Sequence, residues 1–481
     1  MAILSYGRAI TALAESEPDR AAVTCGDQSV TRLELDRRSN RLARAYERLG
    51  VQEGDLVTVA LPNSVEFYEA CVAVWKLGAT PQPVSYRLPD RERQAIVDLA
   101  DARLVIGAEP GAHPGRTVVP AGFEPDPQLS DDPLPDRVSP TWKAPTSGGS
   151  TGRPKLILSG SPAVVDTDGE AALLAGREGC HVVPGPLYHN APFTSSMTGL
   201  VHGNHVVVLP KFDAEATLRA IHDHRATFIL LVPTMMLRIS RLSDDVKARY
   251  DLSSLQVVWH MAAPCPMWLK EAWIEWLGGE RIYELYAGTE AQAVSIIRGD
   301  EWMEHKGSVG RVAVGEMKVV DADGADLPAG EVGEIVMRTS AEGSPTYRYV
   351  GAEARTVDGG WESLGDLGYI DADGYVFLTD RLADMILTGG ANVYPAEVES
   401  ALMEHPRVQT CAVIGLPDED LGSRVHAVVQ TDGGVTEDEL RSFLGERLVR
   451  YKVPRTFELV DWLVRDDAGK VRRSALREER T

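Results

Sequence analysis

Strand-like and helix-like segments alternate along much of this chain, and this alternation restricts its fold more than any other feature. An apolar run at Val57–Leu61 predicts a strand, and Asn63 is expected to cap a helix with apolar positions such as Phe67 and Trp75. The order recurs later as a strand at His205–Leu209, a helix at Asp213–His222 and a strand at Phe228–Val232. Such alternation is typical of layered α/β proteins with a parallel sheet.

The domain organisation follows from the length of the chain and from a change in the kind of secondary structure that the sequence predicts. The chain has 481 residues, too many for one ordinary core of ~100–200 residues. From about Asp321 short strands and tight turns appear, with Asp-Ala-Asp-Gly at 321–324 and again at 371–374, and after Arg381 a compact α+β unit begins. We predict an α/β fold: a large N-terminal body with mixed sheets (1–380), a hinge (381–384) and a small α+β C-terminal domain (385–481).

The charge balance restricts the partners. The formal net charge is −22, which argues against nucleic acid and against an anionic membrane surface, because both need a basic surface. Five scattered cysteines, without a CxxC pair, indicate a reducing compartment. Arg8 and Glu15 interrupt the apolar stretch that a signal peptide would need, and no run approaches the ~20 apolar residues of a membrane span. We therefore expect a cytoplasmic protein.

The segment from Thr146 to Lys155 is the strongest local signal. Its glycines would let backbone N–H groups approach a phosphate, its hydroxyls would donate further bonds, and Lys155 adds a positive charge. It is not a GxxxxGK[ST] loop, because Arg-Pro precedes the lysine and Leu156 follows it. Composition alone fits a surface turn equally well. The candidate phosphate-binding residues are Thr146, Ser147, Gly148, Gly149, Ser150, Thr151, Gly152 and Lys155.

The second signal is the apolar-aromatic run at 283–286, which ends in Ala287-Gly288-Thr289-Glu290. Ligands of α/β sheets bind at strand ends, so this ending places a hydroxyl and a carboxylate where a ligand is expected. Glu290 is a candidate for binding magnesium through its carboxylate. Taken alone, a solvated strand-end glutamate is the simpler interpretation.

Three later segments carry further candidates. Asp366, on a tight turn, could accept both hydroxyls of a ribose, and Arg381 could contact a phosphate; two β-turns with a surface ion pair are the simpler interpretation. Gly389-Gly390 before a helix suggests close backbone approach to a ligand or a partner domain, or a plain helix-entry loop. Lys470 lies in a basic tail, where a lone lysine is normally solvated.

Together and in this order, from about residue 10 to 475, these segments resemble the adenylate-forming superfamily of acyl-CoA synthetases, peptide-synthetase adenylation domains and firefly luciferase. The most similar subgroup is the bacterial fatty-acid, steroid or bile-acid CoA ligases. The segments that resemble that subgroup are His260–Pro266, Glu301-Trp302 and Gly307–Arg311.

The resemblance implies an ATP-, Mg²⁺- and coenzyme A-dependent acyl-CoA ligase with a mobile small domain. The loop at 147–155 would hold the β- and γ-phosphates, with Thr151 and Glu290 near magnesium. Asp366 would bind the ribose, Arg381 the ribose or a phosphate, and Lys470 the carboxylate and α-phosphate. The resemblance assigns further positions to the adenine (Ala262, Ala263, Pro264, Tyr369), to the nucleotide and reacting groups (Tyr286, Ala287, Gly288, Thr289), to the acyl site (His189) and to the coenzyme A tunnel (Gly389, Gly390).

One departure bears on the activity. Ala287 stands where the superfamily usually has glycine, so its methyl group could crowd the transition state and leave only the thioester-forming step, on a supplied acyl-adenylate. An amide-forming ligase and a degenerate acyl- or adenylate-binding protein are also compatible with the sequence. Near the predicted acyl site, Met235, Met236 and Met261 suggest a large apolar acid, or are core filler. We expect a monomer or a homodimer.

Overall fold

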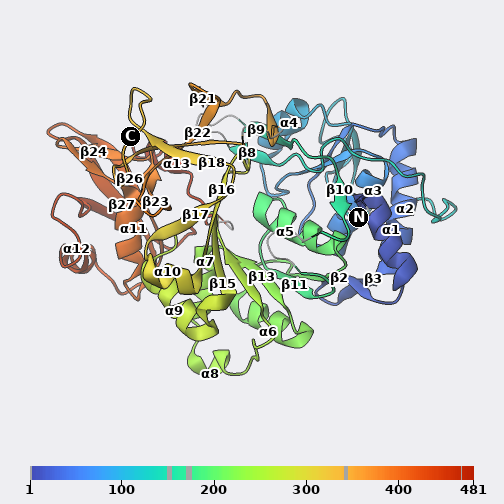
Figure 1. Cartoon of the computed structure of the whole chain (residues 1–481), viewed down its shortest axis with the longest axis horizontal. Helices are drawn as coiled ribbons and strands as arrows, with labels where there is room; N and C mark the ends of the chain where they lie inside the picture. The colour runs from blue at the N-terminus through green and yellow to red at the C-terminus, as the bar shows by residue number, and fades with distance from the viewer. Residues whose placement is uncertain (1–2, 149–153, 170–175, 341–344, 467–468) are drawn as a thin grey trace.

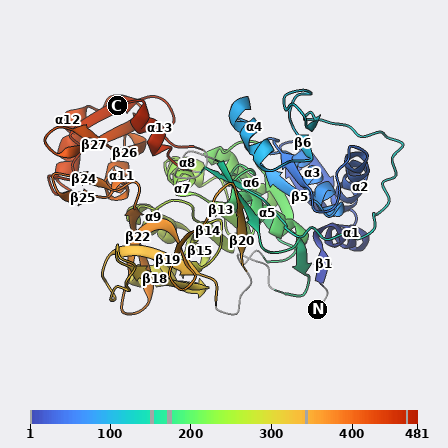
Figure 2. The same cartoon turned by 90° about the horizontal axis from the view of Figure 1, so that it is seen from above.

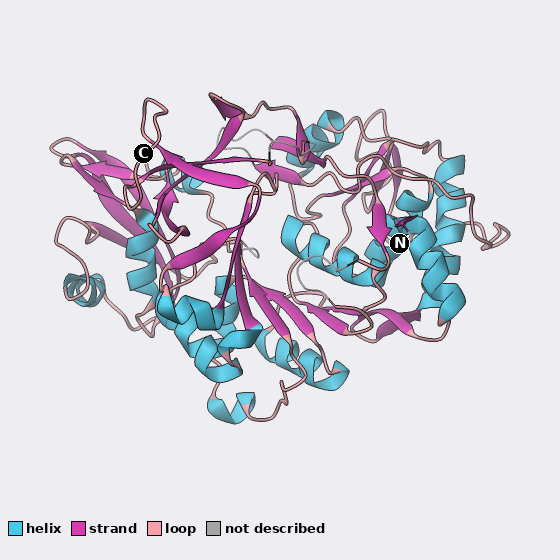
Figure 3. Cartoon of the chain, in the orientation of Figure 1, coloured by secondary structure: helices cyan, strands magenta, loops and turns pink. Residues whose placement is uncertain are grey.

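The computed structural model describes residues 3–148, 154–169, 176–340, 345–466 and 469–481. Figure 1 shows a large body, blue to yellow, with a small orange-to-red domain at one side. Seen from above in Figure 2, this small domain lies at the opposite end of the molecule from the first helices of the chain. Figure 3 shows that most helices lie on the outside, with the sheets between them. The predicted class, a large α/β body and a small α+β domain, is confirmed.

The parallel half of the largest sheet lies in the large body. Its six strands pair parallel with their neighbours, and most of their residues are buried, as in sheets covered on both faces. The predicted strands near 205–209 and 228–232 are confirmed. In spatial order the strands are β2 (Ala21–Cys25), β12 (His205–Val208), β11 (Cys180–Val183), β13 (Phe228–Leu231), β14 (Val257–His260) and β15 (Ile282–Tyr286), with β3 (Gln28–Thr31) antiparallel at the edge.

Helices follow these strands and pack on them. The predicted helix at Asp213–His222 is present as α6, and the Asp213 side chain caps it by accepting a hydrogen bond from the backbone N–H of Ala216 at 2.8 Å. The helix after β11 contacts β11, β12 and β13. The helices of this part of the chain are α5 (Asn190–Val201), α6 (Ala214–His224), α7 (Pro233–Ser240), α8 (Asp244–Lys247), α9 (Met267–Leu277) and α10 (Gly299–Glu304).

The antiparallel half extends the same sheet. The predicted turn at 371–374 joins two antiparallel strands, and Gly374 takes the positive φ of +83° that the turn requires. Beyond β15 the order continues as β16 (Val294–Arg298), β17 (Ser308–Val314), β23 (Tyr375–Arg381), β22 (Trp361–Ile370), β19 (Gly333–Arg338) and β18 (Glu316–Val320), with β21 (Arg355–Val357) beside β22.

The N-terminal part of the body has its own sheet and corrects one prediction. Asn63 does not cap α3; the hydroxyl of Ser64 does, accepting from Phe67 N–H at 3.2 Å. The Asn63 amide instead donates to the carbonyls of Gly185 and Leu209. The parallel order is β5 (Thr80–Pro83), β4 (Leu56–Val59), β6 (Leu104–Ile106) and β7 (Thr117–Val119), with α1 (Tyr6–Ser16), α2 (Arg32–Arg48), α3 (Val65–Lys76) and α4 (Asp90–Leu99).

Two small antiparallel sheets complete the body. In the three-stranded one, the middle strand pairs on one side with the strand before it and on the other with a strand nearly 200 residues later in the chain, joining distant segments beside the predicted phosphate loop. Their strands are β20 (Tyr347–Val350), β9 (Pro154–Ser159) and β8 (Thr146–Gly148) in one sheet, and β1 (Ile3–Ser5) and β10 (Val164–Asp166) in the other.

The small domain is an α+β unit, and the predicted helices near Pro395 and Thr436 and strand at 410–414 are present. Since β23 ends at Arg381 and β24 begins at Ile386, residues 382–385 connect the two parts; the predicted hinge at 381–384, and the division at 380, stay predictions. The elements of the small domain are β24 (Ile386–Thr388), β25 (Ala391–Val393), α11 (Pro395–Met403), β26 (Val408–Asp418), β27 (Gly422–Thr431), α12 (Glu437–Gly445), β28 (Thr456–Val460) and α13 (Arg473–Glu478). Across the described ranges, no helix is long and apolar enough to span a bilayer.

Candidate active site

The hairpin of β8 and β9 carries the predicted phosphate loop. Ser147 pairs with Lys155 in the register, and Thr146 Oγ1 accepts a hydrogen bond from Gln82 at 3.3 Å. Gly148 ends β8. Four predicted phosphate-binding residues lie outside the described residues, so their roles, including that of Thr151 at magnesium, stay predictions: Gly149, Ser150, Thr151 and Gly152.

Lys155, Glu290 and Tyr349 form a compact cluster beside this hairpin. Lys155 Nζ donates to Glu290 Oε1 at 3.2 Å and to the Tyr349 hydroxyl at 2.8 Å. The Tyr349 hydroxyl in turn donates to Glu290 Oε1. Burial, reinforced by Glu290, raises the pKa of Tyr349, so this phenol stays a donor. Sequence reasoning missed Tyr349, because a tyrosine 59 residues from Glu290 gives no local signal.

The residues after β15 bring Glu290 close to the main chain. A Cβ at Gly288 would lie 2.8 Å from Glu290 Oε2 and 2.5 Å from Leu364 Cδ1, so a larger residue would have to displace the ends of these two side chains. Ala287 does not have a positive φ, and its methyl group therefore causes no backbone strain. Thr289 is partly exposed and directly precedes Glu290. The nucleotide contacts of these residues stay predictions.

Asp366 lies where two neighbouring side chains converge on its carboxylate. Tyr286 donates its hydroxyl to Asp366 Oδ2 at 2.8 Å, and Arg381 Nε lies 3.2 Å from Oδ1. Asp366 and Arg381 face each other in the β22–β23 register. Burial, followed by the charge of Asp366, raises the pKa of Tyr286 well above its usual value. The structure thus brings together three predicted nucleotide-binding residues.

Tyr369, predicted to lie near adenine, packs flat against another aromatic ring. It lies on the same strand as Asp366, and its ring stacks on Phe377 with centroids 4.6 Å apart and an interplanar angle of 7°. The pair forms a rigid aromatic surface on the β22–β23 hairpin. Contact of this surface with a base stays a prediction.

The predicted adenine segment follows β14 in a constrained conformation. Ala262 has a φ of +76°, which is unfavourable for a residue with a Cβ and typical of functional sites, while Ala263 and Pro264 are partly to fully exposed. Below it Lys270 Nζ contacts Glu284 Oε2 at 2.6 Å within the core. Sequence reasoning missed this buried ion pair, which fixes α9 to β15 under the segment.

The predicted acyl side is built around the start of α5. His189 directly precedes this helix at the carboxyl edge of the parallel strands, and its ring lies 4.6 Å from that of Tyr188. Ala191, in the first turn, packs against the cluster that contains Trp259 and Met261. Met235 and Met236 are buried in the core layer below the sheet. The acyl role of His189 stays a prediction.

A buried lysine that sequence reasoning missed lies behind the start of α5. Lys143 Nζ donates to Asn190 Oδ1 at 2.5 Å and to Thr194 Oγ1 at 2.7 Å, and it lies 4.4 Å from the ring centroid of Trp142. No carboxylate of the described ranges forms an ion pair with it. Burial lowers the pKa of Lys143 to about 7. Its backbone carbonyl accepts a hydrogen bond from Ser159 N–H in β9 at 3.1 Å, so the residue links the β8–β9 hairpin to the start of α5.

Lys470, in the small domain, lies near two of the predicted nucleotide- and metal-binding residues of the large body, Arg381 and Glu290. It follows a turn in which its backbone N–H donates to Asp466 Oδ1 at 2.8 Å. A Cβ at Gly469 would lie 3.2 Å from Thr234 Oγ1 on α7, so this turn lies against the large body. Although the residue keeps an exposed surface, displacement of water by nearby protein lowers the pKa of Lys470; Arg381 lowers it further, whereas Asp466 and Glu290 raise it.

Gly389 and Gly390 lie elsewhere. They form the tip of the β24–β25 hairpin with φ values of +55° and +81°, which only glycine adopts at low cost. Gly389 N–H donates to the carbonyl of Leu421 in the small domain at 3.0 Å. In this arrangement Lys470 faces the large body, and a place for the glycines in a coenzyme A tunnel stays a prediction.

A network of ion pairs fastens the Lys470 turn inside the small domain. Arg465 donates to the Gly469 carbonyl at 2.9 Å and to Glu399 Oε2 at 2.5 Å. Arg473 bridges Glu399, at 2.8 Å, and Asp384, at 3.0 Å. Burial alone would raise the pKa of Glu399, but the two arginines hold it below its usual value. The connection at 382–385 is thereby tied to the segment that carries Lys470.

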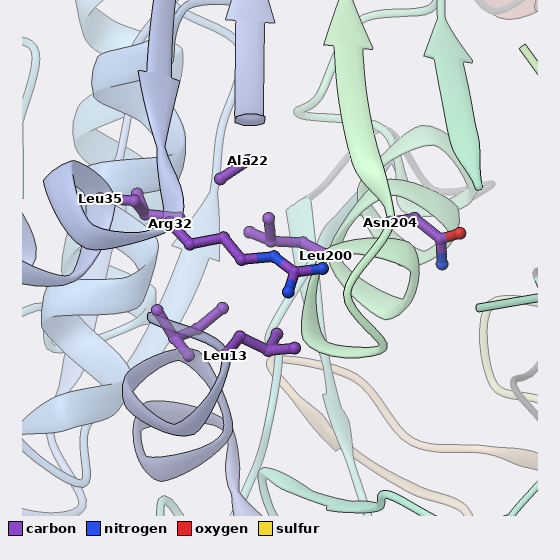
Figure 4. Close-up of a pocket in the computed structure, with 7 residues that line it drawn as sticks. Leu13, Ala22, Arg32, Leu35, Leu200 and Asn204 are labelled. Carbon is purple, nitrogen blue, oxygen red and sulfur yellow. The ribbon is translucent and has the colours of Figure 1, made fainter. Parts of the chain in front are cut away.

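A small hollow lies apart from these residues. Figure 4 shows it between α1, α2 and α5, lined by Leu13, Arg32, Leu200 and Asn204 among others. Arg32 donates to the Gly203 carbonyl at 2.6 Å, which occupies its guanidinium. None of the predicted site residues lines this hollow.

Comparisons with known proteins agree with this geometry. The model for AMP-binding enzymes matches residues 10–344, and the model for the C-terminal domain of AMP-binding enzymes matches residues 397–470. Feruloyl-CoA synthase from an Amycolatopsis species is 33% identical over 487 residues, which span 96% of this chain and 96% of the relative.

Solved structures resemble the whole chain. The o-succinylbenzoate coenzyme A synthetase from Bacillus subtilis, solved with ATP and a magnesium ion, has a TM-score of 0.81 and 25% identity, covering 99% of this chain and 100% of that one. An amide bond synthetase from Marinactinospora thermotolerans has a TM-score of 0.81 and 26% identity, with the same coverage.

Proposed function

The chain belongs to the family of AMP-binding enzymes, and on this premise we propose that it is an acid–CoA ligase that forms an acyl-adenylate from ATP and a large apolar carboxylic acid, then transfers the acyl group to coenzyme A. The predicted superfamily and the AMP-forming ligase class are confirmed by the family match together with the coenzyme A ligases among the relatives. The single observation that supports the proposal most is the Lys470 turn lying against the large body, where the charges of Glu290 and Arg381 act on Lys470.

The first half-reaction needs positive charge at the α-phosphate. A carboxylate that attacks a phosphate brings two anions together, so a cation at phosphorus lowers the barrier. We propose that Lys470 supplies it. Arg381, whose side chain is largely exposed, and Asp366 would bind the ribose side of the nucleotide. Pyrophosphate leaves as the acyl-adenylate forms.

Glu290 is suited to bind magnesium. Its carboxylate already binds one cation, the Lys155 ammonium at 3.2 Å, and a carboxylate is a preferred oxygen ligand of this metal. When bound, magnesium would neutralise phosphate charge; Thr151 would be the second predicted ligand. The residues present therefore fit the ATP- and magnesium-dependence that the resemblance implies, and a relative of this fold binds both.

The second half-reaction would need a different arrangement of the small domain. Lys470 faces the large body, and the Gly389-Gly390 tip contacts Leu421 instead. We propose that the small domain turns about 381–384 after adenylation, which would bring the glycine tip to the thiol of coenzyme A. Motions of this kind complete the catalytic arrangement in many enzymes and often limit their turnover.

The substrate is proposed to be a large apolar acid. Trp259, Met261 and Ala191 share one apolar cluster at the carboxyl edge of the sheet, next to His189. Methionine side chains adapt to irregular shapes, which suits a bulky acid. The proposed location is the cytoplasm, and a monomer or homodimer remains the expected state.

An amide-forming ligase is the second candidate, because an amide bond synthetase resembles this chain as closely as the coenzyme A synthetase does. Its first half-reaction would be the same, and only the acceptor would differ. The loss of adenylation through Ala287 has less support, because Ala287 has an unstrained backbone and Gly288, not Ala287, lies against Glu290. The presence of Lys155, Glu290, Asp366, Arg381 and Lys470 argues against a degenerate binding protein.

One experiment separates these functions. Purified protein is incubated with ATP, Mg²⁺ and a panel of large apolar acids, with coenzyme A or with a primary amine, and the products are identified by mass spectrometry. In parallel each acid is supplied as its pre-formed adenylate. A thioester from both routes supports the proposal. A thioester only from the adenylate means that adenylation is lost, amide alone supports the second candidate, and no product from any route contradicts an enzymatic role.

A further inference from the structure

Tyr349 joins the two oppositely charged residues of the proposed ATP–magnesium site. Its hydroxyl accepts a hydrogen bond from Lys155 Nζ at 2.8 Å and donates one to Glu290 Oε1. The Lys155 ammonium also lies 4.0 Å from the centroid of the tyrosine ring. One side chain therefore contacts both the predicted phosphate-binding cation and the predicted magnesium-binding carboxylate.

The strand that carries Tyr349 holds Glu290 from two sides. β20 pairs with β9, with Tyr349 opposite Ile157, which places Tyr349 diagonally from Lys155 on the same face. Immediately before β20, Thr346 Oγ1 donates to the backbone carbonyl of Glu290 at 2.8 Å. Both the main chain and the side chain of Glu290 are thus fixed by the same short segment.

The buried carboxylate of Glu290 is paired with a cation. Glu290 is only 5% exposed, and removing the partner of a buried charge leaves that charge uncompensated at a large cost. In this structure Lys155 is the partner. If Lys155 turns to a phosphate of ATP, the charge on Glu290 must be neutralised by another cation, which in the proposed function is magnesium.

We propose that Tyr349 is a positioning residue for the magnesium-binding carboxylate: it holds Glu290 in place while Lys155, its partner in the free enzyme, turns to the ATP phosphates and Mg²⁺ replaces the ammonium. The inference rests on the ATP- and magnesium-dependence of the proposed function. It follows that nucleotide and metal bind in a mutually dependent way. ATP without Mg²⁺ would separate Lys155 from Glu290 and leave the carboxylate unpaired.

The test is the magnesium-dependent part of ATP affinity, measured by titration calorimetry without any acid or coenzyme A. Tyr349→Phe keeps the ring over Lys155 and removes only the hydroxyl. We expect it to weaken ATP binding about 10-fold in excess Mg²⁺, the size of one hydrogen bond to a charged group, and less than about 2-fold in EDTA. Equal weakening under both conditions, or no weakening in Mg²⁺, would overturn the inference.

A matched control and a double variant guard against a general loss of structure. Tyr375→Phe also deletes a tyrosine hydroxyl that donates to a glutamate, Glu301, at 2.8 Å, and it should leave both affinities unchanged. If Tyr349 acts through Glu290, adding Tyr349→Phe to Glu290→Gln should cost nothing further in Mg²⁺, whereas a full additional loss of about 10-fold contradicts it. Wild-type protein that binds no ATP would contradict the proposed function itself, a result distinct from either outcome for Tyr349.

Discussion

Lys143 should make the stability of the large body rise with pH. Its side chain is 8% exposed, and its ammonium contacts Asn190 and Thr194 but no carboxylate of the described ranges. Burial lowers its pKa to about 7, from 10.5 in the unfolded chain. Between these values the folded protein has lost the proton and the unfolded chain has kept it. The unfolded state then binds more protons, so stability increases as the pH rises from about 7 towards about 10.5.

The magnitude follows from the pKa difference. Each unit corresponds to ~1.4 kcal/mol, so between about pH 6.5 and about pH 9 Lys143 should contribute a gain of about 2–3 kcal/mol in the free energy of unfolding. Lys143→Met keeps an unbranched side chain that lacks only the terminal ammonium position, and it cannot titrate. At the lower pH the variant should therefore be at least as stable as the wild type. As the pH rises, the free energy of unfolding of the wild type should increase steadily relative to that of the variant.

The assay is thermal unfolding of both proteins across this pH range, followed by tryptophan fluorescence. Only the difference between the two midpoints is interpreted, because titrating groups that they share cancel. A change of several °C in that difference is expected, because 1 kcal/mol shifts the midpoint by ~2–4 °C for 150–250 residues and by less in a larger body. The exposed Lys211→Met serves as control and should shift the midpoint equally at every pH. A pH-independent difference for Lys143→Met would refute the reasoning, since it would mean that this lysine stays charged when buried.

Three further variants test other parts of the site. Gly288→Ala should lower kcat/KM for adenylation about 100-fold with little change in folding, because the new Cβ would displace the Glu290 carboxylate. The rate of pyrophosphate release measures adenylation. A near-normal rate would show that the short distance between residue 288 and the Glu290 carboxylate is dispensable. Lys470→Ala should reduce adenylation about 100- to 1000-fold yet leave thioester formation from a supplied adenylate nearly unchanged, and equal loss of both steps in a coupled assay would argue against its assigned place. Glu399→Gln should destabilise the small domain by about 3–5 kcal/mol in urea unfolding, because Arg465 and Arg473 keep their buried charges without a partner; an unchanged midpoint would contradict this.

Local sequence patterns predicted those elements in which all residues share the same surroundings. β12 and β13 are continuous apolar runs buried on both faces, so their composition alone identifies them. The cap of α3 was mispredicted because Asn63 and Ser64 are both good capping residues. The tertiary structure decides between them: the Asn63 amide is occupied by the carbonyls of Gly185 and Leu209, more than 100 residues away.

The same limit applies to the site. Glu290, Asp366 and Lys470 could be predicted as site residues because each lies in a recognisable short motif. Tyr349 and Lys143 were missed because their meaning depends on partners 194 and 47 residues away, respectively, which no local pattern encodes. The burial that lowers the pKa of Lys143 likewise arises only when α5 packs beside this lysine.

The ion pairs of Asp384 determine which part of the small domain would move together with it. Arg473 and Arg477, both on the last helix α13, each contact the Asp384 carboxylate at 3.0 Å. These ion pairs hold the first and last segments of the small domain together. Across the boundary with the large body, Arg472 makes a long contact of 3.5 Å with the exposed Glu92, and Arg241 donates to the Val408 carbonyl at 2.6 Å. A twist of the backbone just before Asp384 would therefore move the segment that carries Lys470 as one rigid unit, and it would have to break the hydrogen bond from Arg241 to the Val408 carbonyl. The lysine would leave and return to the same position in every cycle.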